Sequence, residues 1–290
     1  MIESVFGSAH HSAQSNPIFS VIVPVSNGVS TIGRCLQSIS VQTTSDWELI
    51  VIDAASTDGT QAILAHYGDA ISYWESETDR GICHAWNKAL AHARGDWLMF
   101  LGADDKLANS GVLAHALPDL PDPAVARVAY GSINLVAQDG QIIGSAGRPW
   151  EEAGEAFYRY NTLPHQAVFH HRSLFDRHGR FDETFRICGD YEMLLRELKS
   201  AQPWFMPDFV VADVAVGGLS MRESSAFLAT REVRRAQHRH GIVNAPEWRS
   251  FRIYRAAAYE GLRRILGPGF ARAAANAYKR AADRGVGQRR

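Results

Sequence analysis

Strand-like and helix-like segments alternate between residues 19 and 101, and this alternation constrains the fold more than any other feature of the sequence. Short β-branched and apolar runs predict strands, and apolar residues three or four positions apart predict helices between them. The predicted strands are residues 19–24, 47–53, 71–75 and 97–101. Because strands joined by helices run in the same direction, we expect a Rossmann-like α/β fold whose mostly parallel sheet carries helices on both faces.

Acidic residues stand at or just past the ends of these strands. Asp53 ends the second strand, Asp79 follows the third, and Asp104-Asp105 follow the fourth. In an open α/β sheet the carboxyl ends of parallel strands share one edge, and ligands bind there. Adjacent carboxylates at a partly buried strand end need a cation or hydrogen-bond donors to offset their charge. The pair therefore predicts a Mg²⁺ or Mn²⁺ site completed by substrate phosphates; the alternative is a solvated turn that caps the next helix.

The charge of the 290-residue chain is unevenly distributed. Residues 1–221 contain 14 Lys and Arg against 26 Asp and Glu, whereas residues 222–290 contain 16 against 5. Three cysteines without a CxxC pattern favour a reducing compartment over a disulfide framework or a zinc site. The first 17 residues lack the cationic start and apolar run of a signal peptide, and no apolar run is long enough to span a membrane. We therefore expect a cytoplasmic protein.

Eight short motifs follow one another along residues 18–221. They are VIVPVSN (21–27), VIDAASTDGT (51–60), DRGI (79–82) with Asn87-Lys88, FLGADD (100–105), LPHQ (163–166), FDETF (181–185), GDYE (189–192) with Arg196, and GGLS (217–220). Together they make the chain similar to the large family-two inverting glycosyltransferases with a GT-A fold. The resemblance implies a sugar donor activated as a nucleoside diphosphate, usually UDP. The chain departs from many relatives at Cys83-His84, where they carry Tyr-Asp, and at Gly102, where they often carry Asn.

The resemblance also implies the residues that bind the nucleotide. Pro24, Val25 and Asn27 match the turn against the base. Asp53 and Asp79 match the contacts to uracil and ribose. From the local sequence alone, Asp53 could instead begin a helix-entry turn with the Ser-Thr-Asp-Gly cluster that follows it.

Four further residues receive roles from the resemblance. Asp104 matches the ribose-side carboxylate, and Asp105 matches the ligand of Mn²⁺ or Mg²⁺. Arg80 belongs to the same nucleotide-sugar-binding set, although Asp79 and Arg80 could form a solvated ion pair instead. His165 is near the donor sugar and diphosphate in relatives with this motif, so we assign it to substrate binding; a lone His is otherwise more often a hydrogen-bonded core or rim residue.

Asp190 is the predicted catalytic base. Inverting transfer needs a carboxylate or His that takes the proton of the acceptor hydroxyl as its oxygen attacks the anomeric carbon. Asp190 follows Gly189 at the start of a predicted helix, whose positive end favours an ionised carboxylate. Capping of that helix is the other interpretation of Asp190, and the GDYE match favours catalysis.

We therefore expect a metal-dependent glycosyltransferase that moves a hexosyl or N-acetylhexosaminyl group from a UDP-sugar to a hydroxyl of a glycan or lipid-linked acceptor in cell-surface polysaccharide synthesis. A catalytically inactive sugar-nucleotide-binding scaffold and a sugar-phosphate nucleotidyltransferase are the alternatives. The nucleotidyltransferase would need a Gly-rich loop and a Lys after the first strand, and neither is present. A dinucleotide-dependent oxidoreductase would need G-x-G-x-x-G there, which Val25-Ser26-Asn27-Gly28 does not supply.

The chain is predicted to have three parts: a flexible N-terminal tail (1–17), a GT-A domain (18–221) and a basic helical extension (222–290). In the extension an apolar stripe from Trp248 to Ile265 is bordered by arginines, and a second such segment runs from Phe270 to Arg284. The stripe could pack on the acidic domain. Alternatively, the cations could bind the anionic inner face of the cytoplasmic membrane, which makes the enzyme peripheral. No nucleic-acid partner is expected, because the domain is acidic and has no reader motif.

Overall fold

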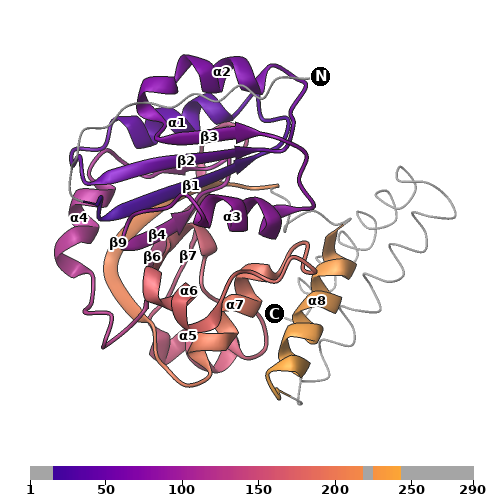
Figure 1. Ribbon diagram of the computed structural model, residues 1–290. Helices are drawn as coiled ribbons and strands as arrows, with labels where there is room; N and C mark the ends of the chain where they lie inside the picture. Colours follow the sequence, from indigo (N-terminus) through magenta and orange to yellow (C-terminus); the bar gives the residue numbers. More distant parts are fainter. Residues whose placement is uncertain (1–15, 218–224, 243–290) are drawn as a thin grey trace, which may run out of the picture. The chain divides into compact units, whose positions relative to one another are not determined.

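The computed structural model describes residues 16–217 and 225–242 (Figure 1). The chain divides into two compact units, residues 1–218 and residues 219–290. The three predicted parts, with a boundary after residue 221, stay a prediction. Most of the predicted N-terminal tail and the amphipathic segments from Trp248 to Arg284 lie outside the described residues.

A mixed nine-stranded sheet forms the centre of the first unit in the described part of the chain. Its strand order is β3-β2-β1-β4-β8-β6-β9-β5, and β7 pairs with β6. The strands are β1 Phe19–Val25, β2 Trp47–Asp53, β3 Tyr73–Ser76, β4 Trp97–Phe100, β5 Lys106–Leu107, β6 Val128–Val136, β7 Ile142–Ala146, β8 Val168–His171 and β9 Trp204–Ala215.

The first four strands in the order, β3, β2, β1 and β4, are all parallel, as the alternation predicted. Helices α1 (Ile32–Ser40), α2 (Thr60–His66) and α3 (Ile82–Leu90) lie between them in the sequence. The register pairs Val25 with Asp53, and Asp53 with Ser76. The carboxyl ends of β1, β2 and β3 are therefore level, and the loops that follow them lie at one edge of the sheet.

The second half of the sheet is not mainly parallel. β8 is antiparallel to both β4 and β6, β7 is antiparallel to β6, and β5 is antiparallel to β9. β6 and β9 are parallel, but their register shifts. Tyr130 pairs with Phe205 and Ser132 with Val210, so β9 contains more residues than β6 between these two pairs. Gly131 lies at this irregularity, where a Cβ would stand 2.5 Å from the Phe209 carbonyl oxygen. The expectation of a mostly parallel sheet thus holds for the βα repeats and not for the strands after them.

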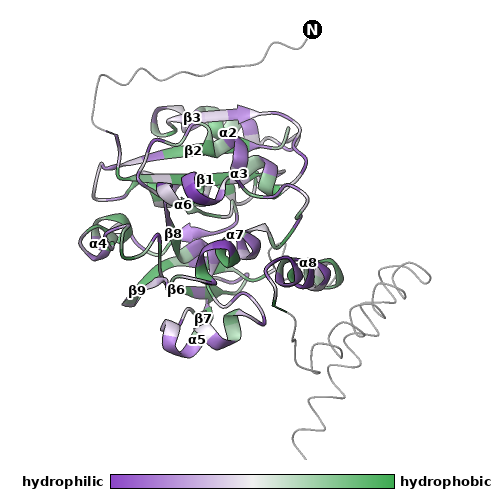
Figure 2. Ribbon diagram, turned by 60° about the horizontal axis from the view of Figure 1, so that its bottom comes forward, coloured by the Kyte–Doolittle hydropathy of each residue, from purple (hydrophilic) through white to green (hydrophobic). Residues whose placement is uncertain are grey.

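Helices cover both faces of the sheet, as predicted. On one face, α1 and α4 (Val112–Asp119) bury apolar residues against Val21, Val23 and Met99. On the other, Trp86 of α3 and Phe175 of α6 (Arg172–His178) contact the ring of Phe100. Figure 2 shows β1 and β2 coloured mainly as hydrophobic, in keeping with their burial. The remaining elements are α5 Trp150–Phe157, α7 Gly189–Leu198 and the 3-10 helices Gly68–Ala70 and His165–Ala167.

The described part of the second unit contains one α-helix, α8 (Ala226–Arg239). It lies within the predicted basic extension and carries Arg231, Arg234, Arg235 and Arg239. No helix in the described ranges, 16–217 and 225–242, is long and apolar enough to cross a membrane.

Candidate active site

The loops after β1 and β2 are hydrogen-bonded to each other. The backbone N–H of Asn27 donates to Ser56 Oγ at 2.6 Å, and the N–H of Thr57 donates back to Asn27 Oδ1 at 3.0 Å. One residue further on, the N–H of Gly28 donates to Thr60 Oγ1 at 2.9 Å. The two loops therefore form one unit at the edge of the sheet that the sequence predicted for the nucleotide.

Two residues of this unit have an uncommon backbone conformation. Asn27 has a φ of 50° and Ala55 a φ of 51°. Asn tolerates the left-handed region, whereas for a residue such as Ala it costs about 1–2 kcal/mol. The cross-loop hydrogen bonds maintain this geometry. Such strain, held in place by surrounding contacts, is common at ligand-binding loops.

Asp53 lies beneath this unit and is fully buried. Its carboxylate accepts from the Ser56 N–H at 3.0 Å, from Ser76 Oγ at 2.5 Å and from Ser56 Oγ. The carboxylate therefore holds the loops after β2 and β3 together. Its assignment as a uracil contact stays a prediction, and in this conformation both of its oxygens are already engaged within the protein. Pro24 and Val25 at the end of β1 are half-buried and buried, and the side chain of Asn27 is exposed.

The carboxylates of Asp104 and Asp105 converge on the space beside Gly102, just past the end of β4. A Cβ on Gly102 would stand 2.6 Å from Asp105 Oδ2 and 2.9 Å from Asp104 Oδ1. Asp104 is exposed, and Asp105 is only 4% exposed. Gly102, where relatives often carry Asn, is therefore the residue that allows both carboxylates to approach this point.

Two neighbours hold the Asp105 carboxylate in place. The N–H of Ala215, at the end of β9, donates to Oδ1 at 2.9 Å, and Gln166 Nε2 donates to Oδ2 at 3.0 Å. Burial and the negative charge of Asp104 nevertheless raise the pKa of Asp105 to about 7. A nearby cation would stabilise the ionised form of such a carboxylate, because it would offset the charge that burial disfavours.

The residues at this point fit a divalent cation that is shared with a ligand. The described residues contain no group of three or more His, Cys, Asp or Glu side chains that could hold a metal alone. Two converging carboxylates supply hard oxygen donors, which suit Mg²⁺ or Mn²⁺ when phosphates complete the coordination. Asp105, with Asp104 beside it, would hold the ion.

Asp79 and Arg80 follow β3, but they do not pair with each other as the alternative interpretation suggested. Asp79 Oδ1 accepts from the N–H of Gly81 at 2.9 Å, which shapes the turn before α3. Arg80 Nη2 is 2.5 Å from Glu183 Oε2, and Asn87 Nδ2 donates to the other oxygen of Glu183 at 3.1 Å. Hydrogen bonding from Arg80 lowers the pKa of Glu183. Arg80 thus joins the loop after β3 to the FDETF segment.

His165 lies in an aromatic cluster. Its ring is stacked on Phe100 with a centroid distance of 5.4 Å, and Trp86 and His170 are at 4.8 and 5.7 Å. Both ring nitrogens are buried without a hydrogen-bond partner in the described part of the chain, and burial lowers the pKa of His165 to about 3. The imidazole is therefore neutral. Its role in substrate binding stays a prediction, and the structure gives it a packing role beside Gln166.

Asp190 lies in the first turn of α7, and Cys188 rather than Asp190 is the N-cap residue. Its Oδ2 accepts from Asn161 Nδ2 at 3.0 Å. Cys83 Sγ fills the space where a Cβ of Gly189 would stand, so the start of α3 touches the start of α7. This contact brings the loop that contains Asp79 close to the helix that contains the predicted base.

Three polar groups of the site were absent from the predicted set: the side chains of Asn161 and Gln166, and the backbone N–H of Ala215. Gln166 belongs to the LPHQ motif, so the motif could have identified it. Asn161 and Ala215 carry no local signal, because their roles arise from chain segments that meet only in the fold.

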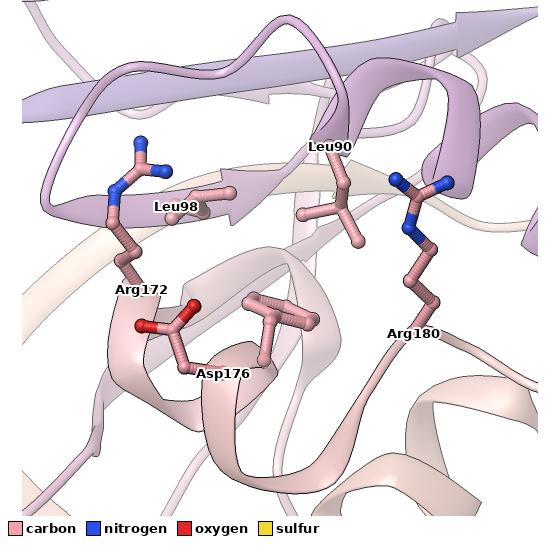
Figure 3. Close-up of a pocket in the computed structure, with 6 residues that line it drawn as sticks. Leu90, Leu98, Arg172, Asp176 and Arg180 are labelled. Carbon is pink, nitrogen blue, oxygen red and sulfur yellow. The ribbon is translucent and has the colours of Figure 1, made fainter.

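A separate hollow lies away from this edge (Figure 3). Its volume is about 180 Å³, and Leu90, Leu98, Phe175, Arg172, Asp176 and Arg180 line it. Leu98 is near the start of β4, whereas the carboxylate pair follows the end of that strand. The guanidinium of Arg172 donates to the carbonyls of Ala93 and Gly95. Since small-molecule sites usually measure about 300–1,000 Å³, this hollow is too small for a nucleotide sugar.

The mixed α/β sheet and the carboxylate pair past β4 fit the GT-A fold of glycosyltransferases. The family model described as "Glycosyl transferase family 2" matches residues 20–175. The chain therefore belongs to glycosyltransferase family 2, and the prediction made from its motifs is confirmed.

Similar proteins include enzymes of glycan synthesis. A PGL/p-HBAD biosynthesis glycosyltransferase of Mycobacterium bovis is 31% identical over 186 residues, covering 62% of this chain and 69% of that protein. An uncharacterized glycosyltransferase of Mycobacterium tuberculosis is 33% identical over 218 residues, covering 73% and 80%. The succinoglycan biosynthesis protein ExoO of Rhizobium meliloti is 28% identical over 200 residues, covering 63% and 56%.

Two solved structures share the fold. The mannosyltransferase PcManGT from Pyrobaculum calidifontis, in complex with GDP-Man and Mn²⁺, has a TM-score of 0.60 and 21% identity over 94% of this chain and 80% of that chain. Residues 1–349 of S. aureus TarS, in complex with UDP-GlcNAc, have a TM-score of 0.58 and 20% identity over 81% and 69%. This chain covers only 43% of a longer TarS chain.

Proposed function

We propose that the enzyme is an inverting, metal-dependent transferase that moves a hexosyl or N-acetylhexosaminyl group from a UDP-sugar to a hydroxyl of a glycan or lipid-linked acceptor. The observation that carries this proposal is the convergence of Asp104 and Asp105 beside Gly102, at the edge formed by the loops after β1 and β2. A nucleoside lying on those loops would place its diphosphate toward the carboxylates. One solved structure of the same fold holds UDP-GlcNAc and another holds GDP-Man with Mn²⁺, which supports a nucleoside diphosphate sugar as the donor.

In this proposal Asp190 is the general base. The acceptor hydroxyl gives its proton to Asp190 while its oxygen forms a bond to the anomeric carbon, and the bond from that carbon to the diphosphate oxygen breaks. A divalent cation held by Asp105, with Asp104 beside it, would offset the charge of the departing nucleoside diphosphate. Attack on the face opposite the leaving group inverts the anomeric configuration.

The remaining predicted contacts are proposed on the donor side. Pro24, Val25 and Asn27 would contact the base, and Asp53 and Asp79 the uracil and ribose. Arg80 would belong to the same nucleotide-sugar-binding set, and His165 would lie near the donor sugar and diphosphate. In this structure Asp53 accepts a hydrogen bond from Ser56, and Arg80 forms an ion pair with Glu183. To bind the donor, each would have to add a contact to the donor or exchange its present partner for it.

A thermal-shift panel tests the donor. The melting temperature is measured with UDP- and GDP-sugars, each with Mn²⁺, Mg²⁺ or EDTA, because a ligand that binds only the native state raises it. We expect the largest rise with a UDP-sugar and a divalent cation. A larger rise with GDP-sugars would replace UDP by GDP in the proposal, and binding without any transfer to glycan acceptors would favour the inactive scaffold.

The basic extension is the proposed attachment to the membrane. Residues 222–290 carry a net charge of +11, from 16 basic and 5 acidic residues, and each cation near an anionic surface adds roughly 1 kcal/mol. Biosynthesis of a lipid-linked or cell-surface glycan at the inner face of the cytoplasmic membrane would place the acceptor beside such a surface.

Vesicle sedimentation tests this part of the proposal. Full-length protein should pellet with vesicles that contain anionic lipid at low salt and return to the supernatant at high salt. The matched variant is full-length protein with Arg249, Arg252 and Arg255 replaced by Gln, and we expect it to pellet less. If the unmodified protein does not sediment with anionic vesicles, the extension packs on the domain or binds a protein partner instead.

A further inference from the structure

One short segment, residues 161–166, contacts both of the carboxylates on which the proposed reaction depends. At its start Asn161 Nδ2 donates to Asp190 Oδ2 at 3.0 Å. At its end Gln166 Nε2 donates to Asp105 Oδ2 at 3.0 Å. The segment connects α5 to β8 and contributes no carboxylate of its own. Its two amides therefore hold two acidic residues that come from distant parts of the sequence.

The orientation of the Asn161 amide is fixed by a second hydrogen bond. The N–H of Leu163 donates to Asn161 Oδ1 at 3.1 Å, so this end of the side chain must be the carbonyl oxygen. The NH₂ group then faces Asp190. An ionised carboxylate has acceptors and no donor. The NH₂ group of Asn161 is therefore a suitable donor to an ionised Asp190.

The segment is anchored independently of this contact. Thr162 Oγ1 donates to the carbonyl of Ala153 in α5 at 3.3 Å, and the side chain of Leu163 is 2% exposed. Asn161 is therefore attached to a fixed piece of backbone. An amide on such a support can restrict rotation of the carboxylate that it contacts.

We propose that Asn161 is a positioning residue for Asp190, and that residues 161–166 set the placement of this base relative to Asp105. The inference rests on the proposed function, in which Asp190 takes the proton and Asp105 faces the diphosphate. Asn161 touches neither substrate in this scheme; its NH₂ group holds Oδ2 of Asp190 in the orientation that the acceptor hydroxyl requires. Misplacement of a reacting group by about 1 Å can lower a rate about 100-fold, so this restraint matters for turnover.

A double-mutant cycle on the full-length protein tests the inference. The variants are Asn161→Ala, Asp190→Asn and the two combined. The matched control is Asn109→Ala, the same substitution at an exposed asparagine whose Oδ1 accepts from the Gly111 N–H. The measurements are kcat, the KM for the sugar donor, UDP binding and the melting temperature.

We expect Asn161→Ala to lower kcat about 10- to 100-fold while the donor KM and UDP binding change less than about threefold. In the Asp190→Asn background the same substitution should have almost no further effect on kcat, because its influence passes through Asp190. Asn109→Ala should keep kcat within about threefold of the unmodified enzyme.

Three outcomes would contradict the proposals, and they are distinguishable. Unchanged kcat in Asn161→Ala, with impaired Asp190→Asn, overturns the role of Asn161 and leaves the base assignment intact. An equal loss from Asn161→Ala in both backgrounds shows that it acts on something other than Asp190, which also overturns the inference. Unimpaired turnover in Asp190→Asn overturns the base assignment itself.

Discussion

Cys83 packs so closely against Gly189 that a Cβ on residue 189 would collide with the sulfur of Cys83. The two residues are at the starts of α3 and α7, and both are buried. α3 follows the loop that contains Asp79 and Arg80, and α7 carries Asp190 directly after the glycine. The packing of a thiol against a glycine therefore joins the donor side of the site to its predicted base.

We expect Gly189→Ala to destabilise the fold by about 1–3 kcal/mol and to lower turnover, because the new methyl group must displace Cys83 or α7. Urea denaturation and initial rates measure the two effects. Cys83→Ala in the same chain should recover most of the loss, since it removes the sulfur that collides with the new methyl group. No recovery in the double variant would mean that Gly189 is needed for a reason other than this contact.

Gly102→Ala should weaken Mn²⁺-dependent UDP binding by at least about tenfold, because its Cβ would force apart carboxylate oxygens that now lie 2.6 and 2.9 Å from that position. Titration calorimetry with UDP and Mn²⁺ measures the change. Gly68→Ala is the matched control, since a Cβ there meets nothing within 4 Å. Equal binding in both variants would refute the shared site of Asp104 and Asp105.

Asp105→Ala should abolish metal-dependent UDP binding, because it removes the carboxylate proposed to hold the cation at the diphosphate. The comparison is UDP affinity with Mn²⁺ and with EDTA, for this variant and for the unmodified enzyme. Asp139→Ala, in an exposed turn, serves as the control. Mn²⁺-dependent binding that survives in Asp105→Ala would remove Asp105 from the metal site.

Asp105→Asn should stabilise the metal-free protein at high pH. The pKa of Asp105 is raised to about 7 in the folded state, from an ordinary value of 3.8. The native state therefore binds this proton more tightly than the unfolded state, and stability falls as the pH rises from about 4 to about 7. In EDTA at pH 8 we expect a gain on the order of 2–4 kcal/mol, which shrinks to nearly zero at pH 4. Urea midpoints at both pH values measure it, and equal stability at pH 8 would contradict the burial argument.

Asp190→Asn should lower kcat by about 10²- to 10⁴-fold, the usual range for a lost general base. UDP affinity should change little, because the carboxylate is proposed to act on the acceptor. Rate and affinity measured on the same preparation separate these effects. If donor affinity falls as much as the rate does, Asp190 belongs to the donor site instead.

The sequence was most informative where local patterns determine the structure. The βα repeats predicted strands β1 to β4 and their parallel direction, and the register of these strands then explains why Asp53, Asp79 and Asp105 lie at one edge of the sheet. The sequence also predicts a hairpin at Asp139-Gly140, because apolar runs stand on either side of this turn-forming pair, and the structure has β6 and β7 there.

Contacts between distant segments could not be predicted in the same way. Arg80 pairs with Glu183, 103 positions later, and Asn161 reaches Asp190 only because α5 and α7 are brought together by the fold. The antiparallel pairing of β8 with β4 and β6 depends on tertiary contacts, which leave no periodic signal in the sequence. The buried position of Asp53 also depends on Ser76, a residue from the neighbouring strand.

If the donor binds at these loops as proposed, the hydrogen bonds of Asn27 with Ser56 and Thr57 affect the rate at which the nucleotide associates. Loops that already support each other do not have to be ordered when the nucleotide arrives, so the entropy of ordering them is lost during folding and not during the encounter. Stopped-flow association with a fluorescent UDP analogue should then be a single step whose rate rises linearly with ligand concentration. Ser56→Ala, which removes the hydroxyl that receives the Asn27 N–H, should slow that step more than it speeds dissociation.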